Sequence, residues 1–240
     1  MTKKEVIFNG KEKRIFSTEE DPGKSIIHYK DTVTAFGNIK RDRILGKGRT
    51  CCTISSIIFG YLNKNGIDTH FIEQTDECEM LCRRIELIPL EITVRNIAAG
   101  SLAVRLGLEE GASLKNTIID LGYNCDELGD PMINCDEVTA MGIVSSDELA
   151  GIRKVAVQVN ELLKKLYAAI GITLVDFKME FGRAMDNGRI IVSDEFSPDT
   201  ARLWDNATGE RLDKDLFRHD LGDVGPAYEE VLRRLQNVKI

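Results

Sequence analysis

The sequence predicts a mixed fold of strands and helices, arranged either as one large α/β domain or as two smaller lobes. Its 240 residues are enough to bury a large core in either arrangement. Residues 1–85 read mainly as short strands, so we expect them to form a small β-rich lobe. Residues 86–240 contain the clearest helical pattern of apolar residues as well as further strands, which indicates a larger α/β lobe.

Short strands dominate the smaller lobe. Five segments have the composition and turn boundaries of strands, and they lie at residues 5–9, 13–18, 25–29, 69–73 and 80–84. A turn at Gly10 and Lys11 separates the first two segments. Residues 50–65 are predicted to form a helix, which Gly66 can end in the left-handed conformation.

The larger lobe is expected to begin with a crossover and a strand. Residues 85–90, stiffened by Pro89, predict the crossover, and residues 91–98 form a β-branched strand. A capping box and a regular apolar stripe predict a long helix over residues 147–170. A further helix over residues 224–237 is expected to close the chain.

Composition and charge exclude several classes of partner. The chain is 42% hydrophobic and 30% charged, which is ordinary for a soluble globular protein. A formal net charge of −7 argues against a general nucleic-acid binder or a membrane-surface protein, so we expect neither partner. The basic N-terminal end lacks the apolar stretch of a signal peptide, and no segment is long enough to span a bilayer. We therefore expect a cytoplasmic protein.

The six cysteines do not follow a metal-binding pattern. They form no C-x-x-C pair, and the three histidines are scattered along the chain. Free thiols, buried or partly buried, are therefore the favoured interpretation.

The strand after the long helix carries charged residues on one face. Asp176, Lys178 and Glu180 alternate with apolar residues, although a half-exposed surface strand would alternate in the same way. A three-residue hairpin loop at residues 186–188 would place Glu180 directly opposite Asp194. Two facing carboxylates repel each other unless a cation lies between them. A two-residue turn would instead place them on opposite faces of the sheet.

Residues 194–205 combine four acidic residues, an arginine and the only tryptophan. Carboxylates are ligands for a hard cation such as Mg²⁺, which usually brings substrate phosphates with it. Arg202 can bind a phosphate or a carboxylate with two parallel hydrogen bonds. A loop so rich in charge is poorly suited to building a core, and a functional site is the better interpretation.

Two turn-rich loops have both a structural and a binding interpretation. Gly10 lies in a turn beside Lys11 and Lys13, and such a turn can cover the phosphates of a nucleotide. An exposed basic hairpin tip would have the same sequence. The acidic loop at residues 126–134 includes Asp130, and it is either a solvated Asp-Pro turn or a set of acceptors for a substrate amino group.

A strand-to-helix junction follows Arg95. Gly100 allows a ligand to approach the backbone closely, and Ser101 can cap the following helix. The backbone amides at the start of that helix can then face an anion. Together with Arg95 these residues predict a cradle for a monophosphate. An ordinary junction with a capping serine is the alternative.

Taken together, these segments closely resemble the SAICAR synthetase family of purine biosynthesis. The matching stretches are residues 88–91, 94–96, 98–102, 130–134, 174–178, 180–182, 194–199 and 202–205. The resemblance implies an ATP-dependent ligase that condenses carboxyaminoimidazole ribotide (CAIR) with L-aspartate and releases SAICAR, ADP and phosphate. It also implies a two-lobed α+β fold with a small antiparallel β-rich N-terminal lobe. ATP would lie in the cleft beside the larger α/β C-terminal lobe, somewhat as in protein kinases and ATP-grasp enzymes, and members are commonly homodimers.

The resemblance assigns a role to each candidate residue. Its ATP-binding set is Gly10, Lys11, Lys13, Glu86 and Leu87, the last two through their backbone. Its CAIR-binding set is Arg95, Ser101, Arg202, Asp176 and Lys178, of which the first three bind the ribotide phosphate. Asp130 and Arg218 are implied for L-aspartate, and Glu180 and Asp194 for Mg²⁺. The implied catalytic set is Lys13, Lys178, Asp176 and Asp130.

The chain departs from the family pattern at two positions. Cys51 stands where many relatives have an asparagine, and Asn124 stands where they frequently have a lysine. If that lysine binds a substrate carboxylate, its loss weakens a contact or transfers the role to Arg218 or another cation.

A carboxylate reacts poorly with an amine, but ATP can convert it to an acyl phosphate that the aspartate amine attacks. Mg²⁺, Lys13 and Lys178 can neutralise charge in this transfer, and Asp130 or Asp176 can take the proton from the amine. Two other classes are a kinase-like phosphotransferase, which would not need aspartate, and a non-catalytic nucleotide-binding regulator. The regulator would lack part of the lysine and metal set, which this chain retains.

Overall fold

The first part of the chain forms an antiparallel sheet beside one long helix. A computed structural model describes residues 1–37 and 39–238. The sheet has the order β1-β2-β3-β7-β6. Its strands are β1 (Lys3–Asn9), β2 (Lys13–Thr18), β3 (Lys24–Tyr29), β6 (Phe71–Asp76) and β7 (Glu79–Arg83). Strands β4 (Thr32–Ala35) and β5 (Lys40–Arg43) pair separately, and helix α1 (Lys47–Lys64) packs on β3, β6 and β7.

The second part is built on a longer antiparallel sheet. Its order is β10-β9-β8-β11-β12, and β13 also pairs with β11. The strands are β8 (Ile85–Ile97), β9 (Ser113–Tyr123), β10 (Met132–Ile133), β11 (Ile172–Ala184), β12 (Ile190–Ser193) and β13 (Ala201–Asp205). The helices are α2 (Gly100–Leu106), the 3-10 turn at Asp126–Leu128, α3 (Cys135–Ala140), α4 (Ser146–Ala169), α5 (Asp215–Arg218) and α6 (Val224–Asn237).

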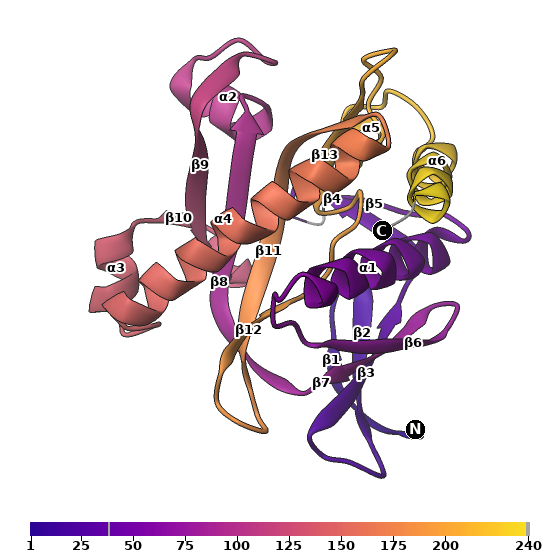
Figure 1. The fold of residues 1–240 in the computed structure, drawn as a ribbon, viewed down its shortest axis with the longest axis vertical. Helices are drawn as coiled ribbons and strands as arrows, with labels where there is room; N and C mark the ends of the chain where they lie inside the picture. The colour runs from indigo at the N-terminus through magenta and orange to yellow at the C-terminus, as the bar shows by residue number, and fades with distance from the viewer. Residues whose placement is uncertain (38, 239–240) are drawn as a thin grey trace.

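One hydrophobic core joins the two sheets. Helix α4 packs on β11 and β8, whereas α6 packs beside α1, and Figure 1 shows α1 and α4 as the two long helices. The parts are also joined through the backbone, because the amide of His70 donates to the carbonyl of Val192 in β12 at 2.9 Å. Buried side chains from α1, α4, α6 and both sheets belong to a single cluster. The mixed fold expected from the sequence is therefore confirmed.

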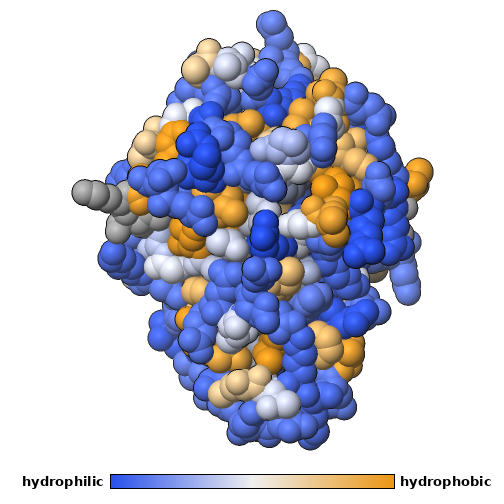
Figure 2. All heavy atoms as spheres, turned by 90° about the vertical axis from the view of Figure 1, so that its right-hand side faces the viewer, coloured by the Kyte–Doolittle hydropathy of each residue, from blue (hydrophilic) through white to orange (hydrophobic). Residues whose placement is uncertain are grey.

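The outer surface fits the composition. Figure 2 shows a mainly hydrophilic face, with hydrophobic residues in small scattered groups, as is usual where protein meets water. Among the described residues, no helix combines the length and apolar character needed to cross a membrane. The six cysteines are free, as expected; three are buried and two are partly buried, whereas Cys135 is exposed and so departs from the expectation of burial.

The long helix and its cap confirm the apolar repeat. The side chain of Ser145 accepts from the amide of Glu148 at 3.2 Å, and the side chain of Glu148 accepts from the amide of Ser145 at 2.9 Å. This capping box fixes the start of α4. Helix α6 also follows its prediction, whereas α1 begins at Lys47 rather than at residue 50.

The predicted crossover at residues 85–90 is wrong, because these residues are the first part of β8. One residue of β11 lies against three of β8 where the pairing passes from Glu180–Glu91 to Gly182–Leu87. This bulge contains Pro89, which has no amide hydrogen to give to a ladder. The proline therefore bends a continuous strand instead of ending it.

The predicted three-residue hairpin loop is also wrong. Glu180 pairs with Ser193 rather than with Asp194, and the amide of Ala184 donates to the carbonyl of Arg189 at 2.9 Å. The loop thus includes Met185 as well as the Asp-Asn-Gly residues, which shifts the register by one. Residues 201–205, expected as loop, form strand β13.

Candidate active site

Three neighbouring strands bring together three of the residues predicted to bind CAIR. Asp176 of β11 pairs with Arg95 of β8 on one side and with Arg202 of β13 on the other. The carboxylate oxygen Oδ2 of Asp176 lies 3.2 Å from Nη1 of Arg95 and 2.8 Å from Nη1 of Arg202. Both contacts join residues far apart in the sequence and depend on the order of the strands, and they support the predicted grouping.

Helix α2 adds Ser101 to this group in a role that differs from the prediction. Ala99 is the N-cap of α2, so the expectation that Ser101 caps the helix is wrong. Instead Nη2 of Arg95 donates to Oγ of Ser101 at 3.0 Å. Gly100 has a φ of +50°, and a Cβ there would lie 2.2 Å from Nη2 of Arg202. Glycine is therefore needed for the arginine to approach this backbone.

Asp215 at the start of α5 contacts three arginines, one from strand β13 and two within four residues of it in the sequence. It accepts from Nε of Arg202 at 2.7 Å, from Nη1 of Arg211 at 3.2 Å and from Nη1 of Arg218 at 2.7 Å. Burial raises the pKa of Asp215, but Arg202 and Arg218 outweigh this effect and hold it below its usual value. Arg95, Arg202, Arg211 and Arg218 form an arginine cluster around Asp176 and Asp215. Guanidinium groups donate paired hydrogen bonds to phosphates and carboxylates, so the cluster is suited to such ligands.

Strand β11 connects this arginine cluster to an acidic pair. Val175, Phe177, Met179 and Phe181 are buried in the core, so Asp176, Lys178 and Glu180 share the other face, as predicted. Nζ of Lys178 lies 2.7 Å from Oε1 of Glu91 on β8. An exposed lysine therefore stands between the arginine cluster and the acidic residues.

The acidic pair is Glu180 and Asp194, which remain close despite the shifted register. Asp194 follows β12 with a φ of +67°, a conformation that turns the chain at the strand end. Burial and the nearby charge of Asp194 raise the pKa of Glu180 to about 8. Nδ2 of Asn124 donates to Oε1 of Glu180 at 2.7 Å. A buried carboxylate beside a second carboxylate offers the oxygen ligands that a divalent cation prefers.

Lys13 reaches this acidic pair from the other sheet. Its ammonium contacts Asp194 and lies 3.0 Å from Oε1 of Glu195. Burial lowers the pKa of Lys13, but the two carboxylates outweigh it and raise the pKa well above its usual value. The β1–β2 hairpin and the segment after β12 thus meet at one charged site.

The structure does not bring every predicted residue into contact with these clusters. Among the contacts of the described residues, Nζ of Lys11 lies 2.6 Å from Oδ1 of Asp126, and Asp130 accepts from the amide of Cys125 at 2.9 Å within its own loop. Glu86 and Leu87 are exposed in β8, and the pairing of β8 with β9 begins only at Leu90. Their backbone edge on that side has no strand partner in the described pairings.

Sequence reasoning missed a buried ionic network beside the site. The ammonium of Lys47 contacts Asp199, and Tyr228 donates to Oδ1 of Asp199 at 2.7 Å. Burial raises the pKa of Asp199, but Lys47 and Lys214 outweigh it and hold the pKa far below its usual range. Lys47, four residues before Cys51, and the acidic residues after Asp194 were visible in the sequence. Their contact was not, because it joins residues 152 positions apart.

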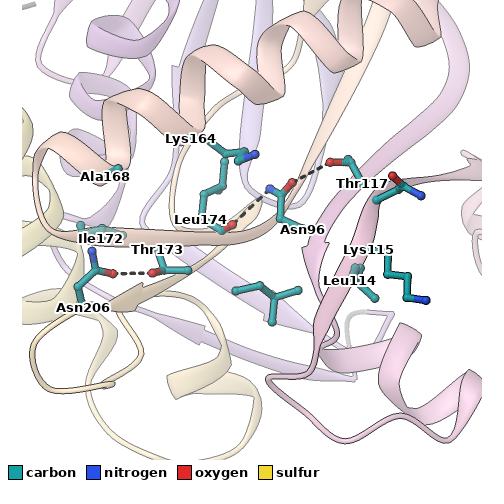
Figure 3. A pocket seen from close by; sticks show the side chains of 12 residues that line it. Asn96, Leu114, Lys115, Thr117, Lys164, Ala168, Ile172, Thr173, Leu174 and Asn206 are labelled. Atoms are coloured by element: carbon teal, nitrogen blue, oxygen red, sulfur yellow. Dashed lines mark hydrogen bonds between the residues drawn. The ribbon is translucent and has the colours of Figure 1, made fainter.

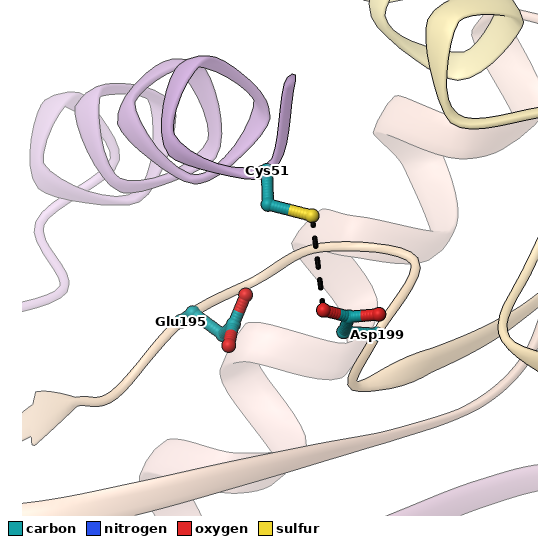
Figure 4. Close-up of side chains that lie close together, drawn as sticks. All are labelled: Cys51, Glu195 and Asp199. Atoms are coloured by element: carbon teal, nitrogen blue, oxygen red, sulfur yellow. Dashed lines mark hydrogen bonds between the residues drawn. The ribbon is translucent and has the colours of Figure 1, made fainter. Parts of the chain in front are cut away.

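Cys51 lies in this network next to Glu195 and Asp199 (Figure 4). Its Sγ is 3.9 Å from Oδ2 of Asp199, so these three side chains are close enough to hold a metal ion. The carboxylates already contact the ammonium groups of Lys47 and Lys13, however, which neutralise their charge. Burial and Asp199 also raise the pKa of the Cys51 thiol, which opposes metal binding.

A separate groove of about 390 Å³ lies on the face of the second sheet that α4 covers (Figure 3). Asn96, Thr117 and Lys164 are among its lining residues, and none of the predicted site residues lines it. Asn96 follows Arg95 directly, so the two side chains point to opposite faces of β8. The groove is therefore distinct from the charged clusters.

Comparisons with known proteins agree on one family. The family model described as SAICAR synthetase matches residues 6–235. A relative from Clostridium perfringens, a phosphoribosylaminoimidazole-succinocarboxamide synthase, is 48% identical over 97% of this chain and 98% of its own length. A second relative with the same name, from Clostridium kluyveri, is 48% identical over 99% of this chain and 100% of its own length.

Solved structures give the same result. The synthase from Ehrlichia chaffeensis has a TM-score of 0.95 at 39% identity and covers 98% of this chain and 100% of its own. A SAICAR synthetase in complex with ADP has a TM-score of 0.93 at 44% identity and covers 98% and 99% of the two chains.

We predict that Lys47→Met lowers the free energy of unfolding by about 3–5 kcal/mol, because it removes the ammonium in direct contact with the buried Asp199 carboxylate and leaves only the Lys214 ammonium, 4.0 Å away. Urea unfolding measures the change. Lys164→Met is the control, since its partner Glu161 lies 3.3 Å away in a largely exposed pair, and about 0.5 kcal/mol or less is expected. Equal changes in the two variants would contradict the prediction.

Proposed function

The chain belongs to the SAICAR synthetase family. We propose which substrate or ion of that family's reaction each charged cluster binds. The reaction is the ATP-dependent condensation of CAIR with L-aspartate, which gives SAICAR, ADP and phosphate. The observation that carries the assignment is the single face of β11. It presents three charged residues in order: Asp176, which contacts the arginine cluster, then Lys178, then Glu180, which belongs to the acidic pair.

The arginine cluster would bind the phosphate of CAIR. Arg95 and Arg202 already meet at Asp176, and Ser101 holds Arg95 in place. Each guanidinium is planar and can donate two parallel hydrogen bonds to a phosphate. Gly100 leaves room for a ligand to approach closely beside Arg202. Lys178, two residues further along β11, would then face the imidazole carboxylate of the bound ribotide.

The acidic pair would hold Mg²⁺ through Glu180 and Asp194. When bound, the ion neutralises phosphate charge during phosphoryl transfer. The raised pKa of Glu180 supports this assignment, because burial and the charge of Asp194 disfavour its ionised form and a bound cation would favour that form. Lys13 contacts Asp194 and Glu195 in this structure. When ATP binds, the Lys13 ammonium would contact the ATP phosphates instead of these two carboxylates.

The nucleotide would lie between residues 1–85, acting as a small lobe, and residues 86–240, acting as a larger one. Gly10, Lys11 and Lys13 of the β1–β2 hairpin would cover its phosphates. Glu86 and Leu87 would offer backbone groups to adenine, which the unpaired edge of β8 at these residues supports. A base bound in this way makes hydrogen bonds that do not depend on the side chains.

Phosphoryl transfer to the CAIR carboxylate would give an acyl phosphate, from which the aspartate amine displaces phosphate. Lys178 and Lys13 would stabilise the developing charge, and Arg218 would hold a carboxylate of L-aspartate. Asp130 and Asp176 are the two residues that we propose to accept the amine proton. Asp130 would have to approach the site with its loop, because its present contact is to Cys125.

The same assignment leads us to propose a homodimer in the cytoplasm that acts on small molecules only. A net charge of −7 supports the absence of nucleic acid and anionic membrane surfaces among its partners. Both proposals rest on the family resemblance and on the sequence.

The function is tested by measuring ADP release while CAIR, L-aspartate and Mg²⁺ are omitted one at a time. We expect release only with all three, together with formation of SAICAR. Release that continues without L-aspartate would instead indicate a phosphotransferase acting on another group.

We predict that Asp194→Asn abolishes turnover and leaves the fold intact, because it removes one proposed ligand of Mg²⁺. ADP release at saturating Mg²⁺ measures the loss, and circular dichroism checks the fold. Asp186→Asn on the same hairpin is the control, since Asp186 is exposed and pairs with Arg83 at 2.8 Å. Unchanged turnover of Asp194→Asn would remove this residue from the metal site.

We predict that Arg202→Ala raises the Michaelis constant for CAIR by at least about tenfold, since charged hydrogen bonds to the ribotide phosphate are lost. The constant for ATP should change much less. Arg183→Ala is a suitable control because Arg183 lies on β11 but pairs with Glu148 of α4 at 2.6 Å. Equal effects of Arg202→Ala on both substrates would exclude it as the phosphate ligand.

A further inference from the structure

Lys214 lies between the two parts of the chain that we assign to ATP and CAIR. Its Nζ is 2.6 Å from Oε1 of Glu12 and 4.0 Å from Oδ1 of Asp199, and its side chain is only 8% exposed. Glu12 directly precedes Lys13 in the β1–β2 hairpin. A lysine from the second part of the chain therefore forms an ion pair with the hairpin that we propose to cover ATP.

Glu12 is also held from within its own part of the chain. Its Oε1 accepts from the amide of Thr34 at 3.0 Å and from Oγ1 of Thr34 at 2.9 Å. Nζ of Lys47 lies 3.8 Å from its other oxygen. Among the described contacts of this carboxylate, Lys214 alone comes from beyond residue 85, so Lys214 joins Glu12 to the second part of the chain. This link is in addition to the contacts that Lys13 of the same hairpin makes with Asp194 and Glu195.

The residue after Lys214 belongs to the arginine cluster. Asp215 accepts from Arg202 at 2.7 Å, while Asp213 accepts from the amides of Leu203 and Asp215, each at 2.8 Å. These bonds fix the turn before α5 to strand β13. Because Lys214 and Asp215 are adjacent in a rigid turn, a shift of one moves the other.

We propose that Lys214 is a positioning residue that couples two binding events. Binding of the ribotide phosphate to the arginine cluster would favour the position of the β1–β2 hairpin that contacts the nucleotide. The proposal rests on the function assigned above. A ribotide phosphate fixes Arg202, and Arg202 fixes Asp215 and the turn that carries Lys214. Lys214 then holds Glu12, and with it the hairpin that carries Lys13, in the position that binds ATP.

This coupling is reciprocal: if CAIR tightens binding of the nucleotide, the nucleotide tightens binding of CAIR by the same factor. The factor is the ratio of the ADP dissociation constants measured without and with saturating CAIR. Isothermal titration calorimetry in the presence of Mg²⁺, with L-aspartate left out, gives both constants without turnover.

Lys40 offers a matched control. Its Nζ lies 2.6 Å from Oδ1 of Asp220 and 2.6 Å from the carbonyl of Phe217, so it also joins the first part of the chain to the segment around α5. Its described contacts do not include the hairpin. Lys40→Met thus removes an equivalent lysine between the same two parts and leaves the path through Glu12 intact.

For the unaltered protein we expect a ratio of at least about five, within the usual range of coupling between two sites. Lys214→Met should bring the ratio to within about twofold of one, whereas Lys40→Met should keep it. Lys214→Arg, which can still reach Glu12, should retain most of the coupling. Glu12→Gln should lose it as Lys214→Met does, and the double variant should lose no more than either single variant.

Three results would overturn the proposal: a ratio of one in the unaltered protein, an unchanged ratio in Lys214→Met, or an equal loss in Lys40→Met. If Lys214→Met fails to fold, Glu12→Gln gives the decision, and circular dichroism distinguishes the two cases. An unaltered protein that forms no SAICAR from CAIR, L-aspartate and ATP would reject the proposed function. An active enzyme whose ratio survives Lys214→Met would reject the coupling alone.

Discussion

The buried contact between the Lys47 ammonium and the Asp199 carboxylate is the constraint on which the site depends. Lys47 begins α1, and Gly48 allows the first turn of that helix to approach the backbone, since a Cβ there would lie 2.6 Å from the carbonyl oxygen of Tyr29. Asp199 lies between β12 and β13, and Tyr228 of α6 completes its hydrogen bonds. Burying both charges is costly, so the pair is stable only while these partners stay in place.

This contact fixes the middle of the segment from Asp194 to Arg202, whose two ends belong to different charged clusters. Asp194 at one end joins the acidic pair with Glu180, and Arg202 at the other end joins the arginine cluster. With Asp199 fixed between them, neither end can move freely, because only a few residues separate each from the anchor. The distance between the proposed metal and phosphate sites is therefore set by a buried ion pair.

Strand β11 provides the other fixed spacing. Its alternation places Phe177 and Met179 in the core under α4, and the charged side chains between them line up on the opposite face. The apolar face resists any slip of the strand, because a shift by one residue would bury Lys178 and expose its neighbours. Packing on one face thus preserves the order of Asp176, Lys178 and Glu180 on the other.

Local patterns in the sequence predicted α4 with its cap, the face shared by Asp176 and Glu180, and the charged character of residues 194–205. These features depend on neighbours within a few residues, where periodicity and capping act. Strand register and the buried network were beyond such reasoning. One added loop residue, Met185, moved the partner of Glu180 to Ser193, and Pro89 bent β8 without ending it. Contacts of Asp199 with Lys47, and of Lys214 with Glu12, join distant segments, and only the packing of the two sheets brings such charges together.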